Sequence, residues 1–167
     1  MNNIKPFWDD EYKHLEYKKM PFNNNYDVSN WREQGYHQDE KYFTGQMVGH
    51  NEKIPKWSQT FLDFATYQYE LKDVGICFYR MVTNEILPAH GDDYKLYREK
   101  FNCEIEDITR IIVFLEDWKS GHYFEIDGQP IVNWNAGNSV VWSGNIKHMA
   151  ANIGVEDRYT LQLTGHK

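Results

Sequence analysis

The 167-residue sequence lacks any apolar run approaching the roughly 20 residues that a membrane-spanning helix needs. It also lacks the basic and then apolar start of a secretion signal, since Met1 leads into the polar Asn2 and Lys5. Cysteine is scarce, and Cys77 and Cys103 are far apart. Two free thiols in a reducing compartment is the simplest interpretation, with one disulfide as the alternative. We therefore expect a cytoplasmic protein with no membrane segment.

An excess of positive charge is also missing. The chain has 18 Lys and Arg residues against 25 Asp and Glu residues, which gives a net charge of −7. The closest approach to a basic cluster is formed by Lys13, Lys18 and Lys19, and acidic residues such as Glu16 interrupt it. Proteins that bind nucleic acids usually carry a basic stripe that contacts phosphates. Nucleic acid is therefore a disfavoured partner.

No linker, repeat or low-complexity run divides the chain, so residues 1–167 are expected to form a single domain. Residues 1–72 would be a helical and irregular support, and residues 73–167 a β core. The first 52 residues show weak periodicity, and residues 22–26 are typical of a loop. Residues 56–71 follow the 3.6-residue period of a helix, with Trp57, Phe61 and Ala65 on one face.

From Val74 onward the pattern becomes that of short strands. Asp127 and Gly128 separate two of them and form a strong hairpin-turn signal. Turn signals at intervals of roughly 8–12 residues are typical of a β-sandwich or jelly roll. Such a fold leaves room for a buried site between two sheets. The expected strands are 75–82, 109–115 (apolar enough to be central), 122–126, 130–134, 138–142, 149–153 and 158–164.

Three residues form a candidate metal site. His90 and Asp92 are two positions apart, so both side chains would leave the same face of an extended chain. A third ligand, His148, lies 58 positions later near the start of an expected strand. Two imidazoles and one carboxylate form the facial triad suited to non-haem Fe(II), with open positions for other ligands.

That pattern has an ordinary structural explanation as well. Two polar residues two positions apart are common in turns, and the chain contains seven histidines. Asp93 is a competing carboxylate, although it would point away from Asp92 in a regular strand.

Arg158 strengthens the metal-site interpretation. It begins the last expected strand, ten positions after His148, and shares a face with Thr160 and Gln162. An arginine that points into a barrel is costly unless a buried anion pairs with it. Its planar guanidinium suits a carboxylate held by two parallel hydrogen bonds. The alternative is a surface arginine paired with Glu156 or a neighbouring acidic residue, Asp157.

The order His90, Asp92, His148 and Arg158 resembles that of the Fe(II)/2-oxoglutarate-dependent dioxygenases, which have a double-stranded β-helix fold. The expected strands from about Val74 to Gly165 resemble that jelly-roll, cupin-like fold over its full length. The resemblance implies that the three triad residues bind Fe(II) and carry catalysis. Arg158, helped by Thr160, would hold the far carboxylate of the co-substrate 2-oxoglutarate.

Within that family the chain is most similar to the aspartyl/asparaginyl β-hydroxylases and prolyl hydroxylases, through residues 110–118 and Gly121. Arg110 lies on the same face as Ile112 and Phe114, so Arg110 is a candidate second contact for the co-substrate. Some aspartyl hydroxylases lack the metal-binding carboxylate that Asp92 provides here. The resemblance implies hydroxylation of a C–H bond with O₂ as oxidant, releasing succinate and CO₂.

Other polar residues are weaker candidates. Tyr79 is expected to be a core tyrosine with a satisfied hydroxyl group, although it could reach the cavity. Tyr94 and Tyr97 follow the metal motif and belong either to a lid or to a solvated turn. His122 is expected to be structural because the triad is already complete.

Two other function classes remain open: a cupin-like metalloenzyme that does not use 2-oxoglutarate, and a non-catalytic binding module with the same fold. A peptide or protein side chain is the first choice of substrate, followed by a free amino acid or other small molecule, and then a nucleobase. The sequence leaves the oligomeric state open.

Overall fold

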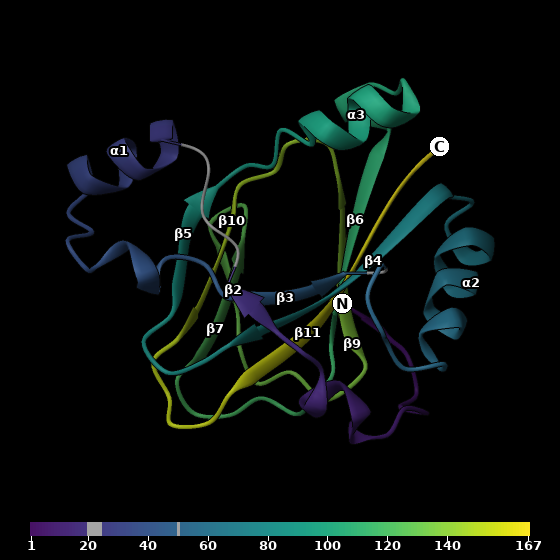
Figure 1. The fold of residues 1–167 in the computed structure, drawn as a ribbon, viewed down its shortest axis with the longest axis horizontal. Coiled ribbons are helices and arrows are strands. Elements are labelled where there is room, and N and C mark those ends of the chain that lie inside the picture. The colour runs from purple at the N-terminus through teal and green to yellow at the C-terminus, as the bar shows by residue number, and fades with distance from the viewer. Residues whose placement is uncertain (20–24, 50) are drawn as a thin grey trace.

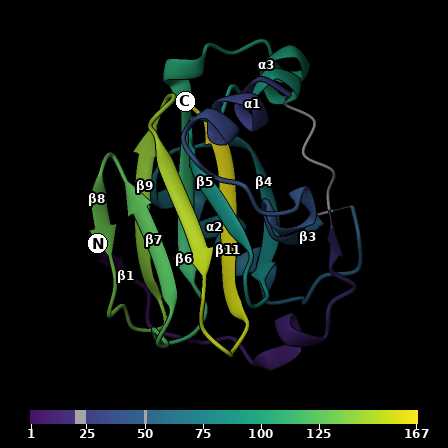
Figure 2. The ribbon, with the colours of Figure 1, turned by 90° about the vertical axis from the view of Figure 1, so that its left-hand side faces the viewer.

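A computed structural model describes residues 1–19, 25–49 and 51–167 (Figure 1). Two antiparallel sheets face each other in a mainly β, jelly-roll arrangement (Figure 2). In order across the large sheet, the strands are β1 (Asn2–Asn3), β9 (Asn138–Ser143), β6 (Ile108–Phe114), β11 (Arg158–His166), β4 (Lys72–Met81), β3 (Gln46–Gly49) and β2 (Lys18–Lys19). The small sheet has the order β5 (Ile86–His90), β10 (His148–Asn152), β7 (His122–Ile126) and β8 (Gln129–Ile131).

Period-2 alternation divides the large sheet into two faces. On β11, Leu161 and Leu163 are fully buried in one apolar cluster, against α2 and the N-terminal segment. On β6, Ile112 and Phe114 belong to a second cluster between the sheets. Since successive side chains of a strand point to opposite faces, one sheet thus supports both a conventional core and the wall of a cavity.

The expected strands of the β core are confirmed, with small shifts at their ends. β6 lies inside the large sheet between β9 and β11, as its apolar sequence predicts. Asp127 and Gly128 both have positive φ angles, 49° and 71°, and they join β7 to β8. A two-residue turn of this kind matches the twist of a hairpin, and Asp-Gly is favoured there.

The helices are α1 (Asn25–Glu33), α2 (Ser58–Gln68) and α3 (Lys95–Phe101), with short 3₁₀ turns at Asp10–His14, Glu40–Tyr42 and Ile105–Asp107. The helix expected over residues 56–71 is α2, which buries Phe61 and Ala65. α1 lies beside β5 at the small sheet, whereas α2 covers the opposite side of the molecule (Figure 1). None of the helices in the described part of the chain has the length and apolar character required to cross a membrane.

The first 52 residues differ from the irregular cover expected of them. They contribute β1, β2 and β3 to the large sheet, and β3 pairs with β4 through Met47 and Tyr79. Of the loop expected at residues 22–26, positions 22–24 lie outside the described residues, and residues 25 and 26 begin α1. The loop expectation is therefore wrong at these two positions, because nine consecutive residues form a helix there.

Candidate functional site

Strand pairing in the small sheet brings His90 and His148 together. His90 ends β5 and His148 begins β10, and the two residues face each other directly in the antiparallel register. Their ring centroids lie 4.4 Å apart, and both side chains are buried. β5 is an edge strand of this sheet. Proline has no backbone N–H to donate to a neighbouring strand, so Pro88 is tolerated at this edge. Two residues far apart in the sequence thus become neighbours.

Backbone carbonyls fix the orientation of both imidazoles. Nδ1 of His90 lies 2.8 Å from the carbonyl oxygen of Pro88, and Nδ1 of His148 lies 3.0 Å from that of Ile146. A carbonyl oxygen only accepts, so each Nδ1 carries the hydrogen and donates it. In the neutral rings, the Nε2 atoms keep free lone pairs, as metal-ligating histidines do.

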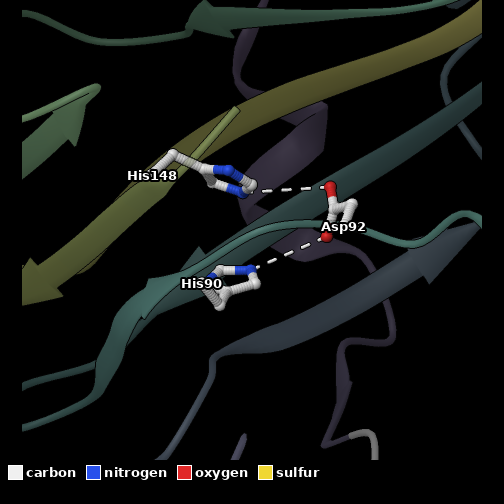
Figure 3. Close-up of side chains that lie close together, drawn as sticks. All are labelled: His90, Asp92 and His148. Atoms are coloured by element: carbon white, nitrogen blue, oxygen red, sulfur yellow. Dashed lines mark ion pairs between the residues drawn. The ribbon is translucent and has the colours of Figure 1, made fainter. Parts of the chain in front are cut away.

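Asp92 completes the group from the turn that follows β5 (Figure 3). Its Oδ1 lies 3.6 Å from Nε2 of His90, and its Oδ2 lies 3.8 Å from Nε2 of His148. The ligand atoms of the three residues all lie within 4.8 Å of one another. This group could hold a metal ion, because its donors are near, convergent and of the N/O type that first-row metals accept.

The charges around the group suit metal binding. Burial alone would raise the pKa of Asp92, but the guanidinium of Arg110, at 3.0 Å, and the neighbouring imidazoles hold that pKa well below its usual range. Burial, reinforced by the nearby His90, lowers the pKa of His148 to about 4. At neutral pH the carboxylate is therefore ionised and the His148 imidazole is neutral, which are the protonation states that a ligated metal needs.

The group opens into a cavity of about 780 Å³ between the two sheets. All six site residues expected from the sequence line it: His90, Asp92, Arg110, His148, Arg158 and Thr160. Much of the remaining wall is apolar and comes from both sheets: Met47, Leu87, Ile112, Phe124, Trp142 and Ala150. A cavity that combines apolar walls with convergent polar groups is a usual form of ligand site.

Arg158 is almost completely buried in this cavity, with 2% of its surface exposed. Its guanidinium carbon lies between 5.5 and 5.8 Å from the ring centroids of Phe114, Phe124 and Trp134. Its polar contact is a weak one at 3.8 Å, from Nη1 to the sulfur of Met81. Among the described residues, no carboxylate forms an ion pair with it. Burial lowers the pKa of Arg158 to about 10, which leaves it a cation at neutral pH.

The alternative of a surface arginine paired with an acidic neighbour is therefore wrong. Glu156 pairs with Lys119 at 3.0 Å instead, and Asp157 accepts a hydrogen bond from Tyr159. Thr160, with 1% exposed, follows Arg158 on the same buried face of β11.

Tyr79 has the satisfied hydroxyl group expected of a core tyrosine. Its oxygen accepts a hydrogen bond from the backbone N–H of Gly45 and lies 2.8 Å from the hydroxyl of Thr44. Both Tyr79 and Thr44 also line the cavity. The oxygen is thus near the cavity wall without being free of protein partners.

The other candidates lie outside the metal group. His122 is buried, and its Nε2 contacts the carbonyl oxygen of Glu156 at 2.9 Å, as expected of a structural histidine. Tyr97 is part of α3 rather than a solvated turn, and its hydroxyl donates to the carbonyl of Asp73. Asp93 is exposed and accepts a hydrogen bond from the backbone N–H of Lys95 at 3.0 Å, just before α3.

Two residues of α1 lie near the His-Asp-His group, and no motif in the sequence indicated this. Trp31 is fully buried, and its indole N–H donates to the carbonyl oxygen of Ala89 at 3.2 Å. Its ring centroid lies 6.2 Å from that of His90. Asp27 lines the cavity. The available signal was the apolar character of Trp31, which predicts burial but not the surface against which it is buried.

No protein-family model matches the chain, and the search of curated proteins gives no match either. Solved structures do resemble it. A prolyl-4-hydroxylase from Pseudomonas putida has a TM-score of 0.52 and 16% identity, covering 73% of this chain and 70% of that one. A cupin protein from Bacteroides fragilis has a TM-score of 0.41 and 13% identity, covering 58% and 69%.

The cupin domain of Cnp3 from Schizosaccharomyces pombe has a TM-score of 0.44 and 6% identity, covering 73% of this chain and 64% of that domain. At these identities the likeness concerns the fold alone. The chain has the mainly β, cupin-like jelly-roll fold, and within it a His-Asp-His group that could bind a metal ion.

Proposed function

We propose that the protein is an Fe(II)- and 2-oxoglutarate-dependent dioxygenase that hydroxylates a C–H bond of a peptide, protein or amino-acid substrate. The observation that carries this proposal is the buried guanidinium of Arg158, which has no carboxylate partner among the described residues and lies in the same cavity as the His-Asp-His group. A metal site by itself would fit many reactions. A metal site that shares a cavity with a buried cation fits a co-substrate that has one chelating end and one anionic end.

The need for an anion follows from the surroundings of Arg158. A buried charge with no partner costs several kcal/mol, and aromatic faces offset only part of that. The guanidinium presents a planar fork that matches a carboxylate, and the neighbouring Thr160 adds a hydroxyl donor. A dicarboxylate whose far end meets Arg158 would supply the missing charge.

In the same cavity, His90, His148 and Asp92 would hold the iron. The backbone contacts at Nδ1 leave the Nε2 atoms of both imidazoles available, and the carboxylate is ionised, so these donors suit a divalent ion. Three protein ligands on one side leave positions for exogenous ligands. With iron and 2-oxoglutarate bound, O₂ would be the oxidant: one oxygen atom would enter the substrate as a hydroxyl group and the other would enter succinate, with release of CO₂. Ile112, Phe124 and Trp142 give this space apolar walls, which would favour a substrate with an apolar surface beside the iron.

The proposal is tested by anaerobic titration of Fe(II) and 2-oxoglutarate into the purified protein, with detection of the visible charge-transfer band of the chelate. Arg158→Met removes the guanidinium but keeps a long side chain. We expect it to weaken 2-oxoglutarate binding by about 10- to 100-fold, the loss expected for a charge-assisted bond, with iron affinity near normal. Arg80→Met is the matched control, because Arg80 lies on β4, outside the cavity, and pairs with Gln46.

Three outcomes would contradict this account. Iron binding without the charge-transfer band would favour a cupin-like metalloenzyme that does not use 2-oxoglutarate. Failure of the protein to bind iron at all would favour a non-catalytic binding module. A band that is equally strong in Arg158→Met would show that the co-substrate carboxylate lies elsewhere.

A further inference from the structure

Asp92 differs from the two histidines in how its position is secured. His90 and His148 belong to paired strands, whereas Asp92 lies in the turn beyond the end of β5. A turn residue has no strand ladder to fix it, and its side chain is 26% exposed. Something other than secondary structure must therefore hold its carboxylate toward the two imidazoles.

Arg110 of β6 provides that support from the opposite sheet. Its Nη2 lies 3.0 Å from Oδ2 of Asp92, and its Nη1 donates to Oε1 of Gln162 at 2.7 Å. The guanidinium also lies over the ring of Tyr94, 5.2 Å from its centroid. Arg110, which is itself held by Gln162 of β11, thus contacts the segment after β5 at Asp92 and again at Tyr94, two residues later.

The same contacts bear on the alternative in which Arg110 binds the co-substrate directly. Both terminal nitrogens already donate to protein oxygens, and Asp92 is the stronger partner because it is charged. Arg158, in contrast, has no carboxylate partner among the residues that the structure describes. The two cavity arginines therefore have different surroundings, and these predict different roles.

We propose that Arg110 is a positioning residue for the metal-binding carboxylate, an inference that rests on the proposed function of the His-Asp-His group. By engaging Oδ2, Arg110 leaves Oδ1, the oxygen that faces His90, as the one offered to the ion. A carboxylate that gives one oxygen rather than two occupies a single coordination position. The guanidinium thereby preserves the open positions that exogenous ligands require.

Titration with Co(II) in the absence of 2-oxoglutarate tests this role directly, because co-substrate binding cannot contribute. We expect Arg110→Met to weaken Co(II) binding by about 10- to 100-fold, the usual loss when a partner of a metal ligand is removed. Arg110→Lys keeps one donor and should restore part of the affinity. Gln162→Met, which frees the far side of the guanidinium, should give a smaller loss, and Arg80→Met none.

The visible bands of bound Co(II) give a second measurement, since their intensity reports the coordination number. They should change in Arg110→Met and recover in Arg110→Lys. Thermal unfolding of each variant identifies any loss of the fold. If Arg110→Met does not fold, the lysine and Gln162 variants supply the comparison.

The outcomes separate the possible roles. Unchanged Co(II) affinity and bands in a folded Arg110→Met protein would overturn the inference, and a raised 2-oxoglutarate requirement in that variant would assign Arg110 to the co-substrate. A lower melting temperature with unchanged Co(II) affinity would show a merely structural arginine, which also overturns it. A wild-type protein that binds no Co(II) would overturn the proposed function itself, together with this inference.

Discussion

At the scale of single residues, the two histidines have the same local hydrogen-bond arrangement. Each donates from Nδ1 to the carbonyl oxygen two positions earlier, which turns its Nε2 toward Asp92. Such a contact fixes both the tautomer and the ring orientation before any ligand arrives. The order and spacing of His90, Asp92 and His148 in the sequence made the two histidines candidate ligands, but the sequence carried no sign of the carbonyl contacts.

Removal of one imidazole gives the simplest test at this scale. We expect His148→Gln to weaken divalent-metal binding by more than about 100-fold, beyond the range of changes made around a metal site. His122→Gln is the matched control, since His122 is buried in the neighbouring β7 but contacts the carbonyl of Glu156. Equal affinities in the two variants, measured by calorimetric titration, would remove His148 from the metal group.

The buried His148 should also make the metal-free protein sensitive to acid. Its pKa is about 4 in the folded protein, chiefly because burial disfavours the charged ring, against an ordinary value of 6.5. The unfolded chain therefore binds a proton more readily between these values, so stability falls as the pH falls from about 6.5 to about 4. Over this pH range the shift lowers the free energy of unfolding by roughly 3 kcal/mol, at about 1.4 kcal/mol per unit of pKa.

Urea unfolding of the metal-free protein across this range checks the expectation. The wild type should lose more stability than His148→Gln, which has no titrating ring at this position. Parallel curves for the two proteins would show that His148 is not held neutral by the fold.

At the scale of elements, the sequence predicted those whose signal is local. The Asp127-Gly128 hairpin, the apolar strand β6 and the amphipathic α2 carry their own patterns. β3 was missed because its pairing depends on β4, 34 residues away in the pair Gln46 and Arg80. The contact between Arg110 and Asp92 was missed for a similar reason, since it depends on how a turn of the small sheet folds over the large one.

The helix α1 is an element whose role can be measured. Trp31 joins α1 to β5 through its hydrogen bond to the carbonyl oxygen of Ala89, and its ring centroid lies 5.1 Å from that of Phe43. We expect Trp31→Ala to lower the free energy of unfolding by about 3–5 kcal/mol, the usual cost of deleting a buried large aromatic side chain. Metal affinity should fall as well, because His90 loses the ring beside it.

Trp31→Phe provides the comparison, because it keeps an aromatic ring but removes the indole donor. It should fall between the wild type and Trp31→Ala in urea unfolding. A Trp31→Ala protein with wild-type stability would show that α1 does not support the small sheet.

At the scale of the whole molecule, the large sheet separates a conventional core from the cavity. One apolar cluster lies between this sheet and α2, and the other between the two sheets. The period-2 pattern of β11 predicted that Arg158 and Thr160 would share the inner face, and both are buried there. The placement of residues 1–167 in a single domain stays a prediction.

Residues of both sheets line the cavity, so a ligand that binds there should stabilise the entire fold. At a free concentration about 100 times its dissociation constant, a ligand that binds only the folded protein adds about 2.7 kcal/mol. We therefore expect Mn(II) together with 2-oxoglutarate to raise the melting temperature by several degrees. The 2-oxoglutarate increment should be lost in Arg158→Met and retained in Arg80→Met. No increment in the wild type would argue against this co-substrate.

The most direct measurement is a crystal structure of the protein with Mn(II) and 2-oxoglutarate, in which anomalous scattering locates the ion. We predict one ion bound by His90, Asp92 and His148, with the far carboxylate of 2-oxoglutarate on Arg158. An ion bound by other residues, or a co-substrate carboxylate away from Arg158, would contradict this prediction.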